Sequence, residues 1–331
     1  MDKKGACRFA NVGIAVGLAA WLVVSAAAQV RKPADDESLL NAERLHRLGL
    51  RYADQGRYDD AIRVLREAVQ IDPGYVLAYN DLGYVYHTAG RRDEAVSSYL
   101  EAIRLRGDYA LAWNNLGVAY SASGNYESAV EALRQALRIK PDYAAAFYNL
   151  GTAYYKAGRT AEAVENLLNA VRLNPSYADA YLSLGVIYTE SGRYAIAVEA
   201  LKQAAALRPG SAPIYRSLGL AHQKAGRLLD AVEAYRKAQG FSPDAEVCNN
   251  LGVVLDLLGR RREAIESYEK AISLTPNYGE AHYNLALAHL RAGEKDKALR
   301  QYATLKMVAA GLADEIFGLM HRDKILSAAR E

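Results

Sequence analysis

The sequence predicts an all-α protein, an α-solenoid of stacked helix hairpins, on three observations. Glycines recur at intervals of 34 residues with a single interval of 33, a second glycine follows each of them seven residues later, and the apolar residues around them are spaced by three and four. Spacings of three and four place side chains on one face of a helix. A fixed period of this length indicates a repeat array, in which each unit packs on its neighbours. The first glycine set comprises Gly49, Gly83, Gly117, Gly151, Gly185, Gly219 and Gly252.

The first helix of each unit is predicted around this glycine. A leucine precedes it, a large residue such as Tyr79 or Trp113 stands four positions before it, and in most units a tyrosine or histidine stands three positions after it. A glycine inside a helix costs roughly 1 kcal/mol relative to alanine. We therefore expect the glycine to allow a close approach by the second helix, with an alanine such as Ala163 facing Gly151.

The second helix is predicted after the second glycine, which ends the first helix and permits a tight turn. Acidic residues such as Asp93 and Glu94 occur early in it, where negative charge suits the helix dipole. A proline closes most units, and the polar residue that follows it is a suitable N-cap for the next unit. The predicted caps are Asp142, Ser176, Asp244 and Asn277. The sixth unit is one residue short, because it lacks the tyrosine that precedes the first helix in most other units.

The residues that recur at equivalent positions, or columns, of these units resemble the pattern of the tetratricopeptide repeat family. That pattern places a large residue, Leu-Gly, Tyr, Ala, Ala and Pro at matching offsets. The resemblance runs from about Ala42 to about Leu305 and covers eight units. It implies a right-handed superhelix of antiparallel helix pairs, with the first helices lining a concave groove. The units are expected at 42–75, 76–109, 110–143, 144–177, 178–211, 212–244, 245–278 and 279–305.

Residues 1–28 have the pattern of a secretory signal peptide. Lys3 and Lys4 precede an apolar run over 12–24, and a stretch of alanines ends at Ala28. A basic start, a short apolar core and an Ala-x-Ala site are typical of cleavable signals. We expect cleavage after Ala28, and hence an exported protein, periplasmic or extracellular.

An uncleaved N-terminal membrane anchor is the alternative. The stretch 9–30 is nearly long enough to span a bilayer, and it would attach the array to the cytoplasmic membrane. In either case we expect residues 29–41 to form a linker and the start of the first helix.

Residues 306–331 are predicted to form a C-terminal capping helix and tail. Leu312, Ile316 and Met320 make an apolar stripe at helical spacing, and the last unit of an array needs a cover for its exposed end. A docking helix for another protein is an alternative interpretation of the stripe. Self-association through the end helices is a further one.

No pattern of catalytic, cofactor-binding or metal-binding residues emerges from the sequence. His222, His282 and His289 stand in columns that aromatic residues hold in other units, so we expect them in the core and not at a metal site. The formal net charge is +3, and without residues 1–28 it falls to +1, from 38 basic and 37 acidic residues. A nearly neutral chain argues against a nucleic-acid partner, since such proteins usually carry a basic stripe. We therefore predict a protein that is not an enzyme and needs neither cofactor nor metal.

The groove is where the sequence predicts binding. Asparagine or aspartate stands two residues before the repeat glycine in several units. The resemblance implies that this column faces the concave surface, where an amide donates to and accepts from the backbone of a bound extended peptide. The alternative is that asparagine is merely common at this position in the family. The predicted peptide-binding residues are Asp81, Tyr84, His87, Asn115, Asn149, Tyr155, Asn250 and Asn284.

The leading functional hypothesis is a non-catalytic protein–protein interaction scaffold that binds a peptide or protein segment in its groove, in cell-envelope assembly. The alternative is a substrate-recruiting partner of a glycosyltransferase system. It is based on the resemblance of these repeats to those of protein O-GlcNAc transferase, whose catalytic domain has no counterpart in this sequence.

Overall fold

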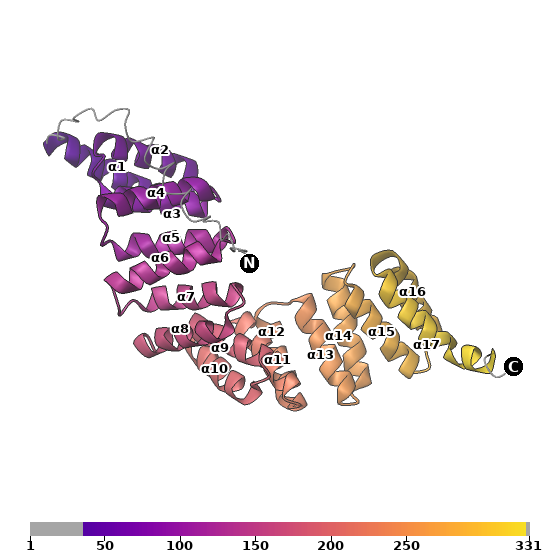
Figure 1. Cartoon of the computed structure of the whole chain (residues 1–331). Coiled ribbons are helices and arrows are strands. Elements are labelled where there is room, and N and C mark those ends of the chain that lie inside the picture. The colour runs from indigo at the N-terminus through magenta and orange to yellow at the C-terminus, as the bar shows by residue number, and fades with distance from the viewer. Residues whose placement is uncertain (1–35, 329–331) are drawn as a thin grey trace, which may run out of the picture.

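The computed structural model describes residues 36–328, with side chains up to His321, and in that range the chain forms seventeen helices and no strand. The helices pack as antiparallel pairs in chain order (Figure 1), which confirms the predicted all-α solenoid. The first helices of the pairs are α1 (Asp36–Asp54), α3 (Val76–Thr88), α5 (Ala110–Ala122), α7 (Ala144–Lys156), α9 (Ala178–Glu190), α11 (Ala212–Lys224), α13 (Ala245–Leu257) and α15 (Gly279–Arg291). The second helices are α2 (Tyr58–Ile71), α4 (Arg92–Leu105), α6 (Tyr126–Ile139), α8 (Thr160–Leu173), α10 (Tyr194–Leu207), α12 (Leu228–Phe241), α14 (Arg261–Leu274) and α16 (Lys295–Val308). The last helix is α17 (Ala310–Ala328).

Each hairpin turns at the second glycine, which ends the first helix. Gly158 has a φ of +78°, a left-handed conformation that residues with a side chain rarely adopt. Its N–H donates to the carbonyl of Tyr155 at 3.0 Å, and the N–H of Arg159 donates to the carbonyl of Tyr154 at 2.8 Å. These bonds form a Schellman motif, which satisfies carbonyls at the end of α7 and redirects the chain into α8. The other hairpins turn at Gly56, Gly90, Gly124, Gly192, Gly226, Gly259 and Gly293, all with positive φ.

Inside each hairpin, the first glycine lies against a large side chain of the second helix. A Cβ atom added at Gly151 would lie 2.8 Å from Cγ of Leu167 and 3.1 Å from the carbonyl oxygen of Ala163. At Gly219 the nearest atoms belong to the ring of Tyr235, at 2.6 Å. The predicted close approach of Ala163 is therefore present at Gly151, but the nearest side chain is that of a leucine or tyrosine. Leucine or tyrosine fills the space, and the alanine approaches Gly151 through its backbone.

The predicted helix caps are wrong at three of the four positions. The N-cap residues of α7, α9 and α15 are the tyrosines that follow the predicted ones, Tyr143, Tyr177 and Tyr278, and their side chains make no capping bond. The exception is Asp244, whose Oδ1 accepts a hydrogen bond from the N–H of Val247 at 3.0 Å. Because the sixth unit lacks the extra tyrosine, its aspartate occupies the cap position of α13.

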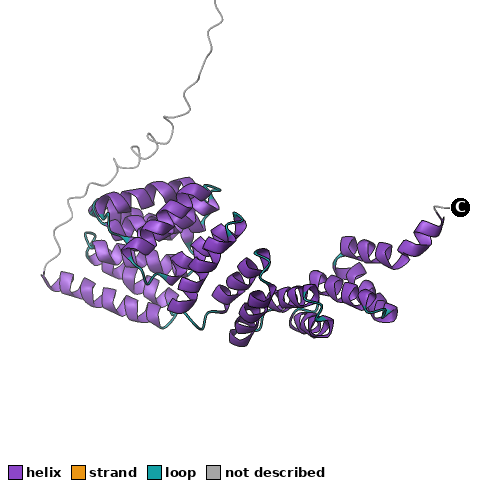
Figure 2. Ribbon diagram, turned by 90° about the horizontal axis from the view of Figure 1, so that it is seen from below, coloured by secondary structure: helices purple, strands orange, loops and turns teal. Residues whose placement is uncertain are grey.

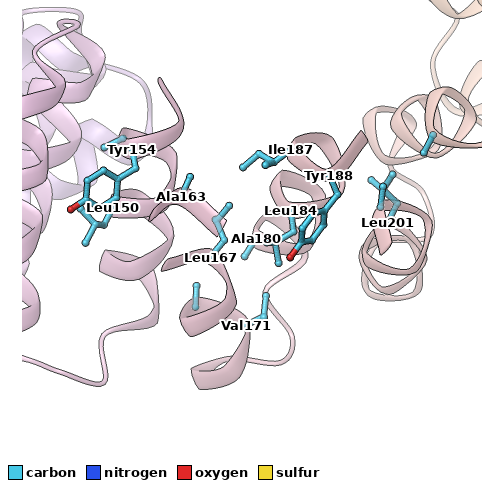
Figure 3. Close-up of a cluster of buried hydrophobic side chains, with 14 of the residues drawn as sticks. Leu150, Tyr154, Ala163, Leu167, Val171, Ala180, Leu184, Ile187, Tyr188 and Leu201 are labelled. Atoms are coloured by element: carbon cyan, nitrogen blue, oxygen red, sulfur yellow. The ribbon is translucent and has the colours of Figure 1, made fainter. Parts of the chain in front are cut away.

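The core runs from unit to unit. In Figure 3, Leu150 and Leu167 of the fourth unit share one cluster of buried side chains with Ile187 of the fifth. That cluster extends from α6 to α12. At the C-terminal end, Ile316 of α17 is fully buried in a cluster with Leu305 of α16 and residues of α15, so α17 covers the last pair.

The first helices form the inner layer of the array. Contacts join α3 to α5, α5 to α7 and α9 to α11, whereas successive second helices within the described residues make no comparable contacts. In a curved stack the layer with the closer spacing is the concave one, so the first helices line the groove. Figure 2 gives a second view of the array, which is elongated and carries its C-terminal end far from the N-terminal pairs.

The N-terminal segment is outside the part of the chain that the structure describes. This applies to the predicted signal peptide at 1–28, to the alternative anchor at 9–30 and to most of the linker at 29–41. Within residues 36–328, no helix combines the length and the apolar character that a membrane span requires.

We expect Gly151→Ala to lower the melting temperature of the array. The new Cβ would overlap Leu167 and push α8 away from α7, and overpacking of this kind costs about 1–3 kcal/mol. Gly240→Ala is the matched control, since Gly240 lies in α12 and an added Cβ there meets no atom within 4 Å. Thermal unfolding followed by circular dichroism compares the two, and equal melting temperatures would contradict this packing.

Candidate functional site: the concave groove

The predicted groove residues lie in two groups on the first helices. The larger group comprises Asp81, Tyr84 and His87 of α3, Asn115 of α5, and Asn149 and Tyr155 of α7. The smaller group comprises Asn250 of α13 and Asn284 of α15. Three successive first helices therefore carry six of the eight residues, and the other two lie near the C-terminal end of the array (Figure 1).

The asparagines of the larger group belong to a hydrogen-bonded ladder between units. Nδ2 of Asn149 donates to Oδ1 of Asn114 at 2.9 Å. Nδ2 of Asn114 donates to Oδ1 of Asn115 at 3.2 Å, and Nδ2 of Asn115 donates to Oδ1 of Asn80 at 3.1 Å. Asn80 and Asn114 are buried, where an unpaired amide would be costly. The amides therefore satisfy one another between adjacent first helices.

The ladder continues into the first unit through Asp81. Nδ2 of Asn80 donates to Oδ1 of Asp81 at 3.0 Å, and Nε2 of His46 donates to Oδ2 of the same carboxylate at 2.7 Å. The hydroxyl of Tyr75 lies 2.9 Å from Nδ1 of the buried His46 ring. Side-chain bonds thus cross all three junctions among the first four units. We call this chain of bonds, from His46 to Asn149, the amide ladder.

A shorter version occurs at the C-terminal end. Nδ2 of Asn284 donates to Oδ1 of the buried Asn249 at 2.9 Å. Asn250 is half-buried and makes no such bond within residues 36–321. At the junction of the fifth and sixth units the two corresponding positions hold Leu182 and Ser217, so an amide pair cannot form there.

These bonds give Asn115, Asn149 and Asn284 a structural role, which is to hold neighbouring units in register. The repeat period predicts Asn115 and Asn149 as groove residues but does not predict their buried partners, Asn80 and Asn114. The available signal was the second asparagine one residue earlier in the same helices. An amide has two N–H donors and two oxygen lone pairs, so each retains some capacity for a ligand, and peptide binding by these residues stays a prediction.

Large apolar side chains beside the amide ladder are exposed. Tyr84 of α3 is 56% exposed, and Leu77 of α3 and Leu111 of α5 are 42% and 39% exposed. All three lie on the first helices that carry the ladder. Apolar side chains that gather on one surface of a folded protein indicate a place where another molecule binds.

Two further groove residues have shifted pKa values. The hydroxyl of Tyr155 donates to the carboxylate of Glu190 at 2.5 Å, and this bond, with burial as the second cause, raises the pKa of Tyr155 to about 12. Burial, together with the nearby charge of Arg92, lowers the pKa of His87. Nδ1 of His87 is buried and has no hydrogen-bond partner among the described residues. A protonated phenol and a neutral imidazole at neutral pH suit recognition through hydrogen bonds.

A cavity of about 320 Å³ opens between α5 and α7. Val118 of α5 and Tyr148 of α7 contribute apolar surface to it, and Asn149 and Lys156 contribute polar groups. Because Asn149 belongs to the amide ladder, the cavity adjoins the ladder. It has room for a side chain of a bound segment.

The chain belongs to the tetratricopeptide repeat family. A model described as "TPR repeat" matches residues 49–90, 88–124, 119–158 and 255–293, and one described as "Tetratricopeptide repeat" matches 148–212 and 188–246. Arrays of this family generally serve as non-catalytic scaffolds for protein interactions, and the exposed groove is consistent with that class. Within residues 36–321, no group of His, Cys, Asp or Glu side chains is placed to hold a metal ion. No curated protein sequence matches the chain.

Solved structures agree with this fold. A tetratricopeptide repeat protein from Parabacteroides merdae is 19% identical, with a TM-score of 0.56 over 75% of this chain and 99% of that one. The APC/C hetero-tetramer Cut9–Hcn1 is 18% identical, with a TM-score of 0.56 over 78% of this chain and 52% of that one. The MamA protein is 30% identical, with a TM-score of 0.46 over 50% of this chain and 91% of that one. The first two similarities concern the solenoid fold.

We expect Asn114→Ala to destabilise the N-terminal units. It removes the acceptor for Asn149 and the donor to Asn115, and a broken buried hydrogen bond costs about 1–3 kcal/mol when a partner is left unsatisfied. Asn250→Ala is the control, since Asn250 makes no inter-unit amide bond in the described structure. Urea unfolding compares the variants. A midpoint for Asn114→Ala that equals that of Asn250→Ala would contradict the structural role of the ladder.

Proposed function

We propose that this protein binds an extended or helical protein segment against the first helices of its N-terminal units. The observation that carries the proposal is the exposed row of Leu77, Tyr84 and Leu111 beside the amide ladder. Apolar side chains of a bound segment would cover this row, and its backbone would pair with the polar groups around it. Such a surface favours a segment with regularly spaced apolar residues over a charged tail.

The amide ladder supports this proposal because it fixes the shape of the groove before a partner arrives. Side-chain bonds cross the junctions between the first four units, so the first helices there have little freedom to shift. A binding surface that is already ordered loses less conformational entropy on association. We therefore place the main docking site on α3, α5 and α7, rather than on the C-terminal units.

We further propose that the protein acts in the cell envelope, as an assembly factor. This part of the proposal is based on the sequence of residues 1–28, with its lysines and its apolar run before Ala28. A scaffold that presents a groove to exported segments would need to be on the same side of the membrane as those segments. Attachment to the cytoplasmic membrane through 9–30 remains the alternative for its location.

Site-specific photocrosslinking in the native cell tests the docking site. With a photoreactive amino acid at Tyr84, we expect a crosslinked protein that mass spectrometry identifies. Leu229 of α12 is the control, because it is 69% exposed and lies on a second helix. The identified protein, once purified, should bind Tyr84→Ala about ten-fold more weakly than the natural chain, in line with the loss of a buried aromatic contact. Equal crosslinking from both positions would refute a docking site in the groove.

N-terminal sequencing of the protein from its native compartment tests the location. We expect the mature chain to begin at Gln29 and to be recovered outside the cytoplasm, because the alanines before Gln29 form the predicted cleavage site. A chain that begins at Met1 and fractionates with the membrane would support the anchor instead. Recovery of the intact chain in the soluble cytoplasm would refute both.

A role as a substrate-recruiting partner of a glycosyltransferase system is a second candidate. Its specific support is the asparagine column, since the resemblance to protein O-GlcNAc transferase includes that column. In the structure, the side chains of Asn115 and Asn149 use part of their hydrogen-bonding capacity in the amide ladder. We therefore favour the apolar row as the main contact and rank the envelope scaffold first.

A further inference from the structure

A second cavity lies at the junction of the fifth and sixth units. It has a volume of about 350 Å³ and lies between the second helices α10 and α12, over α11. Its lining includes Lys202 and Ala205 of α10, Tyr215 and His222 of α11, and Arg227 at the start of α12. Since the second helices form the outer layer, this cavity is separate from the groove and from the function proposed for it.

Two side chains that are smaller than their counterparts line this cavity. His222 stands in a column that holds tyrosine in each of the first five units. Ala205 stands in a column that holds a large aliphatic residue in each of the first four. The counterparts of His222 are Tyr52, Tyr86, Tyr120, Tyr154 and Tyr188, and those of Ala205 are Val69, Ile103, Leu137 and Val171. At this one junction, a phenol ring is thus replaced by the smaller imidazole ring, and a branched aliphatic side chain is replaced by a methyl group.

The arginine at the start of the second helix makes two contacts in the first, second and fourth units that it does not make in the fifth and sixth. Arg159 lies over the ring of Tyr154 at 4.5 Å and pairs with Glu162 at 2.7 Å. Arg57 and Arg91 have the same two partners in their own units, a tyrosine ring and an acid three residues on. Their counterpart Arg227 has neither contact among the described residues, because His222 replaces the tyrosine and Asp230, the acid three residues on, does not pair with it. Arg227 is exposed, and its guanidinium lies at the edge of the cavity without a carboxylate partner.

His222 is also without a partner. It is only 6% exposed, and its Nδ1 makes no hydrogen bond within the described part of the chain. The closest carboxylate oxygen, Oδ2 of Asp230, is 3.7 Å away, too far for a hydrogen bond. Burial lowers the pKa of His222 against the raising effect of Asp230, and Arg227 and Lys202 lower it further. The ring is therefore neutral at neutral pH.

Two lysines of the lining have carboxylate partners. Nζ of Lys237 lies 2.7 Å from Glu233, and Nζ of Lys202 lies 3.3 Å from Glu199. Asp230 is mostly exposed to solvent. The cavity therefore has an apolar part, formed by Tyr215, Leu218 and two alanines, and a charged rim on which the guanidinium of Arg227 has no carboxylate partner.

We propose that this cavity binds a small aromatic carboxylate. The ring of such a molecule would fill the space that tyrosine fills in the first five units, and its carboxylate would pair with Arg227 as the acid side chain does at Arg159. The bound molecule would also lie against Nδ1 of His222, which has no hydrogen-bond partner in the described part of the chain. The bound molecule thus supplies the ring and the carboxylate contact that Arg227 does not make in this unit, and it contacts both α10 and α12.

Benzoate is the probe, titrated into the isotope-labelled full chain and followed by NMR. We expect saturable chemical-shift changes confined to α10, α11 and α12. His222→Tyr and Ala205→Val should each reduce the affinity about ten-fold or more, because each refills the cavity with a side chain that its column holds elsewhere. Arg227→Gln should reduce it by about the same factor through loss of the charged pair.

His289→Tyr is the matched control. His289 stands in the same column in the eighth unit, but its Nδ1 lies 2.7 Å from Glu294 and it lines none of the cavities described above. This variant should bind benzoate as the natural chain does. Thermal unfolding confirms that each variant is folded, and Ala205→Val tests the cavity independently of any change at His222.

Four outcomes would overturn the proposal. One is the absence of saturable shifts with benzoate, and another is unchanged affinity in both His222→Tyr and Ala205→Val. Binding of benzylamine as tight as that of benzoate would exclude pairing with Arg227. Binding of inorganic phosphate as tight as that of benzoate would show that the aromatic ring contributes nothing.

Discussion

In seven of the eight helix pairs a glycine of the first helix lies against a leucine or tyrosine of the second, and this contact sets the distance between the two helices. At Gly185 an added Cβ would lie only 2.3 Å from Cγ of Leu201, and at Gly151 it would lie 2.8 Å from Cγ of Leu167. A helix pair this close buries the leucine or tyrosine fully, and repetition of the pair builds a continuous core. The surface that remains for binding is then set by curvature, which places the first helices on the inside.

The period of the glycines was enough to predict the pairs, their order and the all-α class, because a repeat array constrains every unit in the same way. The caps could not be predicted in the same way. Asn174 shows the reason: its Oδ1 accepts from the N–H of Ser176 at 3.0 Å, so the polar residues around Pro175 form the turn between units and do not cap α9. Spacing along the chain does not decide which of two nearby polar residues caps a helix.

The repeat period predicts which helix face lines the groove, but it does not predict the hydrogen bonds and the burial of the residues on that face. Asn115 and Asn149 are 34 residues apart, so they occupy the same position in successive units, and the period predicts both. The ladder bonds join residues 35 positions apart, Asn115 to Asn80 and Asn149 to Asn114. Such a bond connects two different columns, so alignment at a fixed period cannot reveal it. The exposed fraction of Tyr84 and the burial of Asn80 likewise depend on the angle between neighbouring pairs, which the sequence does not specify.

The junction of the fifth and sixth units has no amide pair, like the junctions on either side of it, and it also holds a cavity. Leu182 stands where an amide would continue the ladder, and His222 and Ala205 leave a cavity between the second helices. In a repeat array, stability is approximately the sum of the unit terms and the terms for each junction. A cavity between the second helices removes side-chain packing from this junction. A bound molecule that filled it would add contacts to both α10 and α12 and so strengthen the coupling between the fifth and sixth units.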